Sequence, residues 1–117
     1  MKFLFQYFKY LITITILFLG CNTGFSQKKV NLKESFLEAE SYMLFEEYKE
    51  ALPLYLELSK AFPDNDNFNF RIGQCYLNIP HEKEKSISYL EKAINNINPK
   101  YKEGNFKETK APTEAIY

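Results

Sequence analysis

The sequence predicts an all-α fold of antiparallel helix-turn-helix repeats, with two repeats followed by the start of a third. From residue 32 to residue 95, apolar residues recur at the spacing that places them on one helix face. Two stretches of this region also match each other, small residue for small and large for large. A repeat near 34 residues indicates a helical solenoid, in which each hairpin buries its face against the next. The matched pairs are Ala39 with Gly73 and Tyr42 with Tyr76, 34 residues apart, and Ala51 with Ser86, Tyr55 with Leu90 and Leu58 with Ala93, 35 residues apart.

Residues 1–26 are predicted to be a signal peptide, because a basic start precedes an apolar run over residues 11–19. That run is shorter than the ~20 apolar residues that a membrane-spanning helix requires. We favour a cut after Ser26. A lipoprotein signal ending at an acylated Cys21 is the alternative, and an uncleaved anchor is a third reading that Lys9 disfavours. We expect an exported protein of the periplasm or outer membrane of a Gram-negative bacterium, attached to a membrane only through the signal or a lipid on Cys21.

The charges of the whole chain balance, with 15 basic and 15 acidic residues. Because nucleic-acid binding depends on a basic surface, the sequence predicts no nucleic-acid partner. His81 is the only histidine, and no catalytic triad, phosphate-binding loop or metal-ligand spacing occurs. Cys75 would be alone after signal removal, which leaves no internal disulfide or zinc site and favours a buried apolar role. We therefore expect neither enzyme activity nor a cofactor.

The repeat region is expected over residues 32–99, after a polar lead-in at residues 27–31. Asn31 is predicted to cap the first helix, and Asp66 or Asn67 the third. Residues 100–110 are predicted to be a polar loop, and residues 111–117 the first turns of a further helix. We interpret this end as truncated, so that the chain is the N-terminal piece of a longer protein; a complete protein is the alternative. The four helices of the repeat region are expected at residues 32–46, 48–61, 67–78 and 82–95.

Gly73 lies in the middle of the third predicted helix, where glycine is ~1 kcal/mol less favourable than alanine. We expect a steric reason for it, namely close approach of the neighbouring helix. The fourth helix is expected to turn Ile87, Leu90, Ala93 and Ile94 inward. Packing within and between the repeats is assigned to Ala39, Tyr42, Tyr48, Ala51, Tyr55, Leu58, Gly73, Tyr76, Ser86, Leu90 and Ala93.

This pattern resembles the tetratricopeptide repeat (TPR). In the first copy the matching residues are Ala39, Tyr42, Tyr48, Ala51, Tyr55 and Pro63, and in the second they are Gly73, Tyr76 and Ala93. The tryptophan that often begins the repeat is missing from both copies. The order of a signal, a repeat pair and a proline-led helix also resembles the N-terminal part of exported Bacteroidetes proteins of the TPR/outer-membrane protein A-like type. Those proteins continue into a β-propeller and a peptidoglycan-binding domain.

The resemblance implies a protein-protein interaction module, since the first helix of each TPR hairpin lines a concave groove. We expect the groove to bind a peptide or partner helix of unknown identity, within an envelope-associated assembly. One alternative is that, with so few repeats, some of the groove residues simply pack against a missing neighbour of the array. Another is that the chain is a structural spacer, which holds a further domain away from the membrane. The expected groove residues are Phe36, Glu40, Met43, Leu44, Phe70, Gln74, Leu77 and Asn78.

Overall fold

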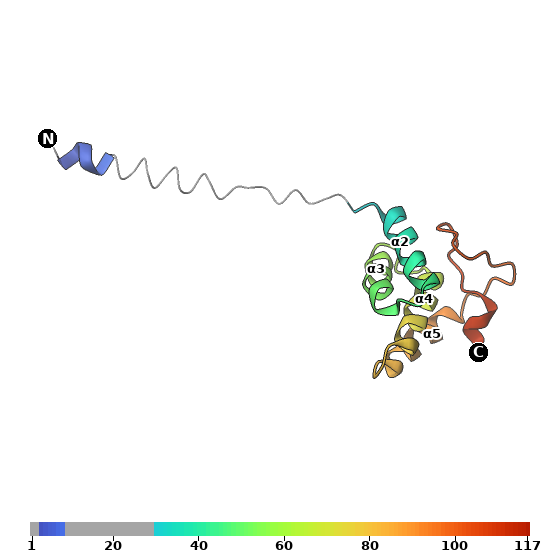
Figure 1. Cartoon of the computed structure of the whole chain (residues 1–117). Helices are drawn as coiled ribbons and strands as arrows, with labels where there is room; N and C mark the ends of the chain where they lie inside the picture. The colour runs from blue at the N-terminus through green and yellow to red at the C-terminus, as the bar shows by residue number, and fades with distance from the viewer. Residues whose placement is uncertain (1–2, 9–29) are drawn as a thin grey trace.

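A computed structural model describes residues 3–8 and 30–117 of the chain (Figure 1). Within these residues no strand forms, and the one piece of β-pairing is an isolated parallel bridge between Ile97 and Ala111. The prediction of an all-α fold is therefore confirmed. The elements are α2 (Leu32–Leu44), α3 (Tyr48–Ala61), α4 (Asp66–Asn78), the short 3-10 helix η1 (Lys83–Lys85), α5 (Ser86–Ala93) and the 3-10 helix η2 (Thr113–Ile116).

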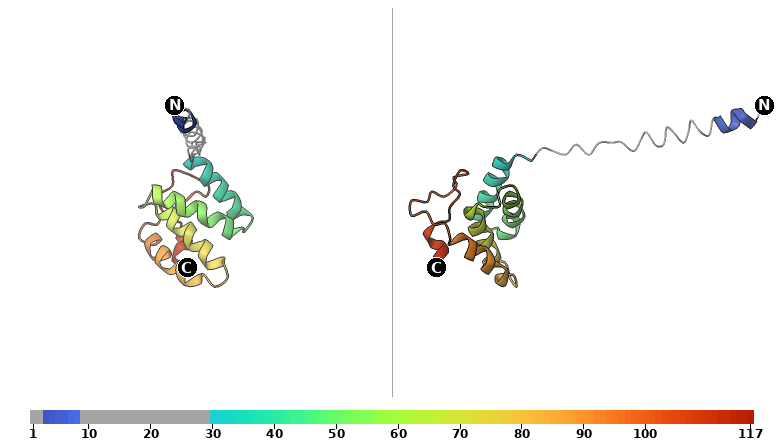
Figure 2. Two further views of the ribbon diagram at one scale, coloured as in Figure 1. Left: turned by 90° about the vertical axis from the view of Figure 1, so that its left-hand side faces the viewer. Right: turned by 180° about the vertical axis from the view of Figure 1, so that it is seen from behind.

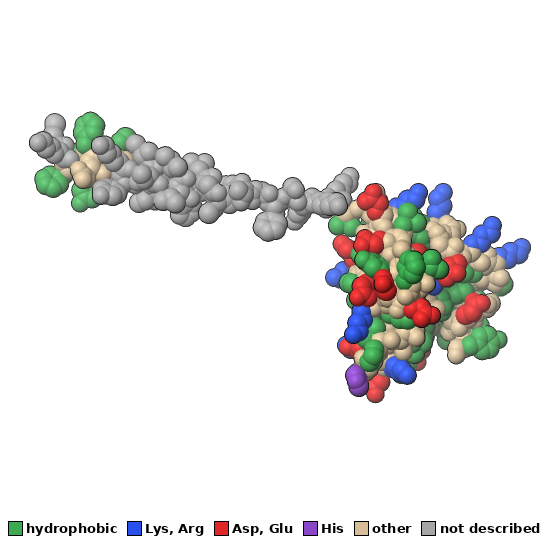
Figure 3. Space-filling view, viewed as in Figure 1, with side chains coloured by type: hydrophobic (Ala, Val, Ile, Leu, Met, Phe, Trp, Pro, Cys, Tyr) green, Lys and Arg blue, Asp and Glu red, His purple; other side chains and the backbone are tan. Residues whose placement is uncertain are grey.

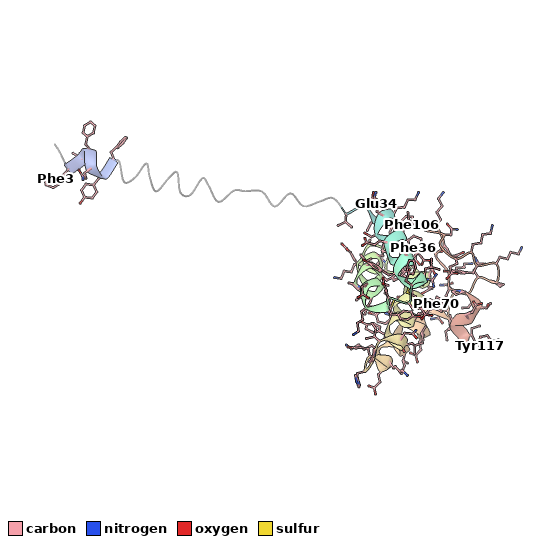
Figure 4. All side chains as sticks on the ribbon, viewed as in Figure 1. Phe3, Glu34, Phe36, Phe70, Phe106 and Tyr117 are labelled. Carbon is pink, nitrogen blue, oxygen red and sulfur yellow. The ribbon has the colours of Figure 1, made fainter. Side chains whose placement is uncertain are left out.

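Residues 3–8 are also helical, and Phe3 in this stretch is exposed (Figure 4). The predicted cleavage site at Ser26 and the predicted lipidation site at Cys21 lie outside the described residues. None of the helices in the described part of the chain is long and apolar enough to cross a bilayer.

Side-chain caps fix where two of the helices begin. Asn31 Oδ1 accepts hydrogen bonds from the backbone N–H groups of Lys33 and Glu34, as predicted. For α4 the predicted cap, Asp66 or Asn67, was wrong, because Asn65 accepts from the N–H of Phe68, at 3.1 Å. Both asparagines have extended backbones and satisfy N–H groups that have no partner inside the helix.

Each long helix packs on the next along the chain: α2 on α3, α3 on α4 and α4 on α5 (Figures 1 and 2). The core between them is rich in aromatic rings, which pack at tilted angles. The centroids of the Phe36 and Phe68 rings are 6.0 Å apart, and those of Tyr55 and Phe68 are 6.3 Å apart. All three side chains are completely buried. Tilted ring pairs at these distances stabilise a core beyond the area that they bury.

Small residues lie where two helices come close. Ala39 and Ala51 are completely buried in the core shared by α2, α3 and α4. A Cβ atom added to Gly73 would lie 2.6 Å from both Cγ and Cδ2 of Leu90. Non-bonded carbon atoms do not approach so closely, so a larger residue here would force Leu90 or the contact of α4 with α5 to shift. The predicted steric role of Gly73 is confirmed.

The last helix of the repeat region, α5, is shorter than predicted. The fourth helix was expected from residue 82 to residue 95, but its first turn is the separate helix η1 and α5 ends at Ala93. Ile87 and Ile94 were expected to be inward, which is wrong, since they are 57% and 46% exposed. The reason is that, among the described helices, α4 is the only long one that packs on α5, so one side of α5 stays exposed.

Residues 100–110 form no helix or strand, in agreement with the predicted polar loop, but the loop packs on the helices. We call residues 95–112 the C-terminal segment; it turns back and lies beside α2 and α4 (Figures 1 and 4). Its Phe106 ring lies 5.5 Å from the ring of Phe36, centroid to centroid, and 6.1 Å from the ring of Phe62. The carbonyl oxygen of Thr109 accepts a 2.9 Å hydrogen bond from the N–H of Asp66, the first residue of α4.

Residues 111–117 were expected to begin an α-helix, but they contain only the 3-10 turn η2. Ala111 and Ala115 are buried with Phe70 and Ala93 in a small cluster of their own. This end of the described chain therefore packs against α4 and α5.

Candidate binding cavity

A cavity of about 630 Å³ lies between the C-terminal half of α2, α4 and the C-terminal segment. From α2 it is lined by Glu40, Met43 and Leu44, and from α4 by Gln74. These four are half of the residues predicted to face a groove. Seen from the side of Figure 3, acidic side chains gather around hydrophobic ones over α2 and α3.

The other four predicted groove residues do not line this cavity. Phe36 and Phe70 are 0% and 5% exposed, so the prediction that they face a groove is wrong; they pack inside this chain and not against a missing repeat. Phe36 is covered by Phe106 of the C-terminal segment, and Figure 4 shows these two side by side. Leu77 and Asn78, at the end of α4, are exposed.

Arg71 is the centre of the site, and sequence reasoning missed it. Its side chain enters from α4 and the residue is only 4% exposed. Nη2 lies 3.0 Å from Glu40 Oε2 and 3.0 Å from Glu103 Oε1, and Nη1 donates to Gln74 Oε1 at 3.0 Å. Nε is also buried and has no acceptor among the described residues. One signal was available, because Arg71 is the only arginine in the chain and lies three residues after Phe68 and four before Cys75, which places it on the helix face of these two apolar residues.

Arg71 and Tyr55 each keep one protonation state near pH 7. Burial alone would lower the pKa of Arg71, but the negative charge of Glu40, together with the smaller effects of Tyr55, Tyr101 and Glu103, outweighs burial, and the pKa lies above its usual value. Burial, assisted by the negative charge of Glu40, raises the pKa of the Tyr55 phenol, whose Oη donates a short hydrogen bond to Glu40 Oε1. Arg71 is therefore always charged and Tyr55 always neutral near pH 7. These groups are suited to hold charges in place and not to transfer protons.

Cys75 is buried beside this cluster, with its Sγ 3.5 Å from Met43 Sδ. Burial raises the pKa of its thiol to about 12, and the charge of Arg71 opposes this only in part. Because the thiolate is the reactive form, this cysteine is inert at neutral pH. The predicted role as a small buried side chain is confirmed.

The pair formed by Arg71 and Glu103 separates the cavity from a second one of about 390 Å³. The second cavity lies on the other side of the pair and is lined by Phe70, Tyr101 and Pro112. Tyr101 is held there by a 2.6 Å hydrogen bond from its Oη to Asn67 Oδ1. The C-terminal segment thus divides the face of α4 into two openings.

Nothing in the described residues groups three histidine, cysteine or acidic side chains in a way that would hold a metal ion. No protein-family model matches the chain, and comparison with curated proteins and with solved structures gives no match either.

Proposed function

We propose that this chain is an exported protein-interaction module of the TPR type, which binds a peptide or a partner helix in the cavity between α2 and α4. In this proposal it acts in an envelope-associated assembly. The cavity is the observation that carries the proposal. It has a volume of about 630 Å³, and Leu37, Met43 and Leu44 give one part of its lining an apolar surface.

The rim residues support a protein ligand. Leu44 is 80% exposed and Leu37 is 53% exposed, and both line the cavity. Phe45, which follows Leu44 at the end of α2, is 70% exposed. Burying one leucine side chain contributes about 1.5–3 kcal/mol, so a ligand that covers this rim would gain affinity from each of these side chains. The two copies of the repeat match in the positions of their small and bulky residues, and this supports the proposal that the repeats are of the TPR type.

Peptide selection against the full chain tests the proposal. Linear peptides are selected from a random display library, and the affinity of each is then measured for two variants. Leu44→Lys changes the cavity rim, whereas Ile87→Lys changes an equally apolar exposed residue on α5. Phe70 is unsuitable for this purpose, because a lysine at a buried position would disrupt folding.

We expect selected peptides to lose at least tenfold in affinity on Leu44→Lys, which corresponds to about 1.4 kcal/mol. Ile87→Lys should leave their affinity unchanged. If no peptide is selected, or if the selected peptides are insensitive to Leu44→Lys, the cavity is not a binding site. A structural spacer, which needs no ligand, would then be the better description.

A further inference from the structure

The walls and the mouth of the cavity differ in character. Leu37, Met43 and Leu44 provide an apolar wall, whereas Glu46 and Glu103 supply carboxylates. Among the described residues that line the cavity, Arg71 is the one cation, and it already contacts two carboxylates. In the described part of the chain Glu46 forms no ion pair. The cavity therefore has an excess of negative charge beside an apolar surface.

Glu46 occupies an unusual backbone position. Its φ is +59°, in the left-handed region where glycine is preferred at the end of a helix. Its N–H donates to the carbonyl of Met43, and the N–H of Glu47 donates to that of Tyr42, so the turn is firmly held. Glycine would relieve the strain of this turn, and the glutamate instead places a carboxylate at the cavity. A strained residue that lines a cavity is a reason to look for a binding role.

We propose that the cavity binds a partner segment in which leucine-like side chains alternate with lysine or arginine. This inference rests on the proposed function and adds the chemistry of the ligand. The apolar side chains of the segment would cover Leu37 and Leu44, and a cationic side chain would meet Glu46 and Glu103. An acidic segment is disfavoured, because Arg71 is already flanked by Glu40 and Glu103 and has no charge left to balance a further carboxylate.

Two synthetic peptides test the charge preference on the full chain. Both carry fluorescein and alternate leucine with a charged residue, which is lysine in one and glutamate in the other. Binding is measured by fluorescence anisotropy at low and at high salt. We expect the lysine peptide to bind and to weaken as salt rises, and the glutamate peptide not to bind.

A pair of glycine substitutions separates charge from backbone strain. His81 is exposed in the turn between α4 and α5 and has a φ of +66°, close to that of Glu46. Glu46→Gly and His81→Gly should therefore both raise the urea concentration at which half of the protein unfolds. Only Glu46→Gly removes a cavity carboxylate, so it alone should weaken the lysine peptide, by about tenfold.

Three results would overturn the inference: no binding of the lysine peptide, equal binding of both peptides, or an unchanged affinity in Glu46→Gly. The proposed function fails separately. If library peptides that depend on Leu44 are acidic or uncharged, the cavity is a binding site and only the charge preference is wrong. If no library peptide depends on Leu44, both proposals are wrong.

Discussion

Arg71 on α4 holds the carboxylate of Glu40 on α2 at 3.0 Å, and the two side chains are only 5% and 14% exposed. This pair joins two helices that are not neighbours in the chain. The second carboxylate on the same guanidinium, Glu103, has a 76% exposed side chain. The two ion pairs have the same length but differ greatly in their contact with water.

Burial should decide what each pair contributes to stability. Arg71→Met leaves the shielded Glu40 carboxylate without its cation, and we expect a loss of about 3–5 kcal/mol in the free energy of unfolding. Glu103→Gln should cost less than about 1 kcal/mol, because water screens that pair. Urea unfolding followed by circular dichroism measures both. Equal losses in the two variants would show that exposure does not govern these pairs.

The contact of Gly73 with Leu90 predicts a second effect. Gly73→Ala places a methyl group 2.6 Å from Leu90 Cγ, and we expect a loss of about 1–3 kcal/mol despite the better helix propensity of alanine. Leu90→Ala removes the atoms that clash. In a double-mutant cycle, the Gly73→Ala loss should therefore shrink or reverse sign in the Leu90→Ala background. If Gly73→Ala costs as much stability in the Leu90→Ala background, the strain does not come from the contact with Leu90.

Phe106 should anchor the C-terminal segment. Phe106→Ala removes ring contacts with Phe36 and Phe62, and we expect a loss of about 2 kcal/mol, below the range for a fully buried phenylalanine. Hydrogen exchange gives a local measurement, since the N–H groups of Asp66 and Asn67 both donate to Thr109 O. They should exchange faster in the variant.

The control in this experiment is the N–H of Ala51, which donates to Glu47 O in the first turn of α3. Once the change in global stability is taken into account, its exchange rate should stay the same. Unchanged exchange at Asp66 would mean that Phe106 does not hold the segment.

Stability should fall at alkaline pH. Burial raises the pKa of Tyr101 to about 12, whereas the unfolded chain ionises near its ordinary value of about 10. Between these values the folded state binds more protons, so stability decreases as pH rises. The contribution is complete below pH about 10 and is lost as pH passes about 12.

Tyr101→Phe provides the comparison for this alkaline limb. It removes the ionisable group, so the free energy of unfolding should fall less steeply with pH than in the parent. Urea titrations across this pH range measure the slope. An identical slope in the two proteins would assign the alkaline loss to other groups, such as Tyr55, whose pKa burial also raises.

The helices could be predicted because capping residues and the spacing of apolar residues determine them, and both are local features of the sequence. The bounds of α2, α3 and α4 lie within two residues of the predicted ones, since a side chain such as Asn31 and the apolar spacing fix them. The steric role of Gly73 followed from the cost of glycine in a helix. These features depend on a few neighbouring residues, and a single sequence contains them.

The packing of the C-terminal segment on the helices could not be predicted, because it depends on hydrogen bonds and an ion pair between residues that are distant in the chain. Tyr101 bonds to Asn67, Glu103 to Arg71, and Asn96 to Asp66, and no periodic pattern marks such partners. The burial of Phe36 and the division of the groove by Glu103 follow from this segment. Phe36 and Phe70 are the two predicted groove residues that the chain after α5 covers, through Phe106 and through Ala111 and Ala115.

The tie between the start of α4 and the C-terminal segment has a kinetic consequence. Asn65 Nδ2 donates to Glu108 O across 43 residues of chain, and Thr109 O accepts from the next two N–H groups. Closing such a long loop has an entropic cost that the short α2–α3 turn avoids. In refolding, the hairpin of α2 and α3 should therefore form early. The first turn of α4 should stay frayed until the C-terminal segment packs against it.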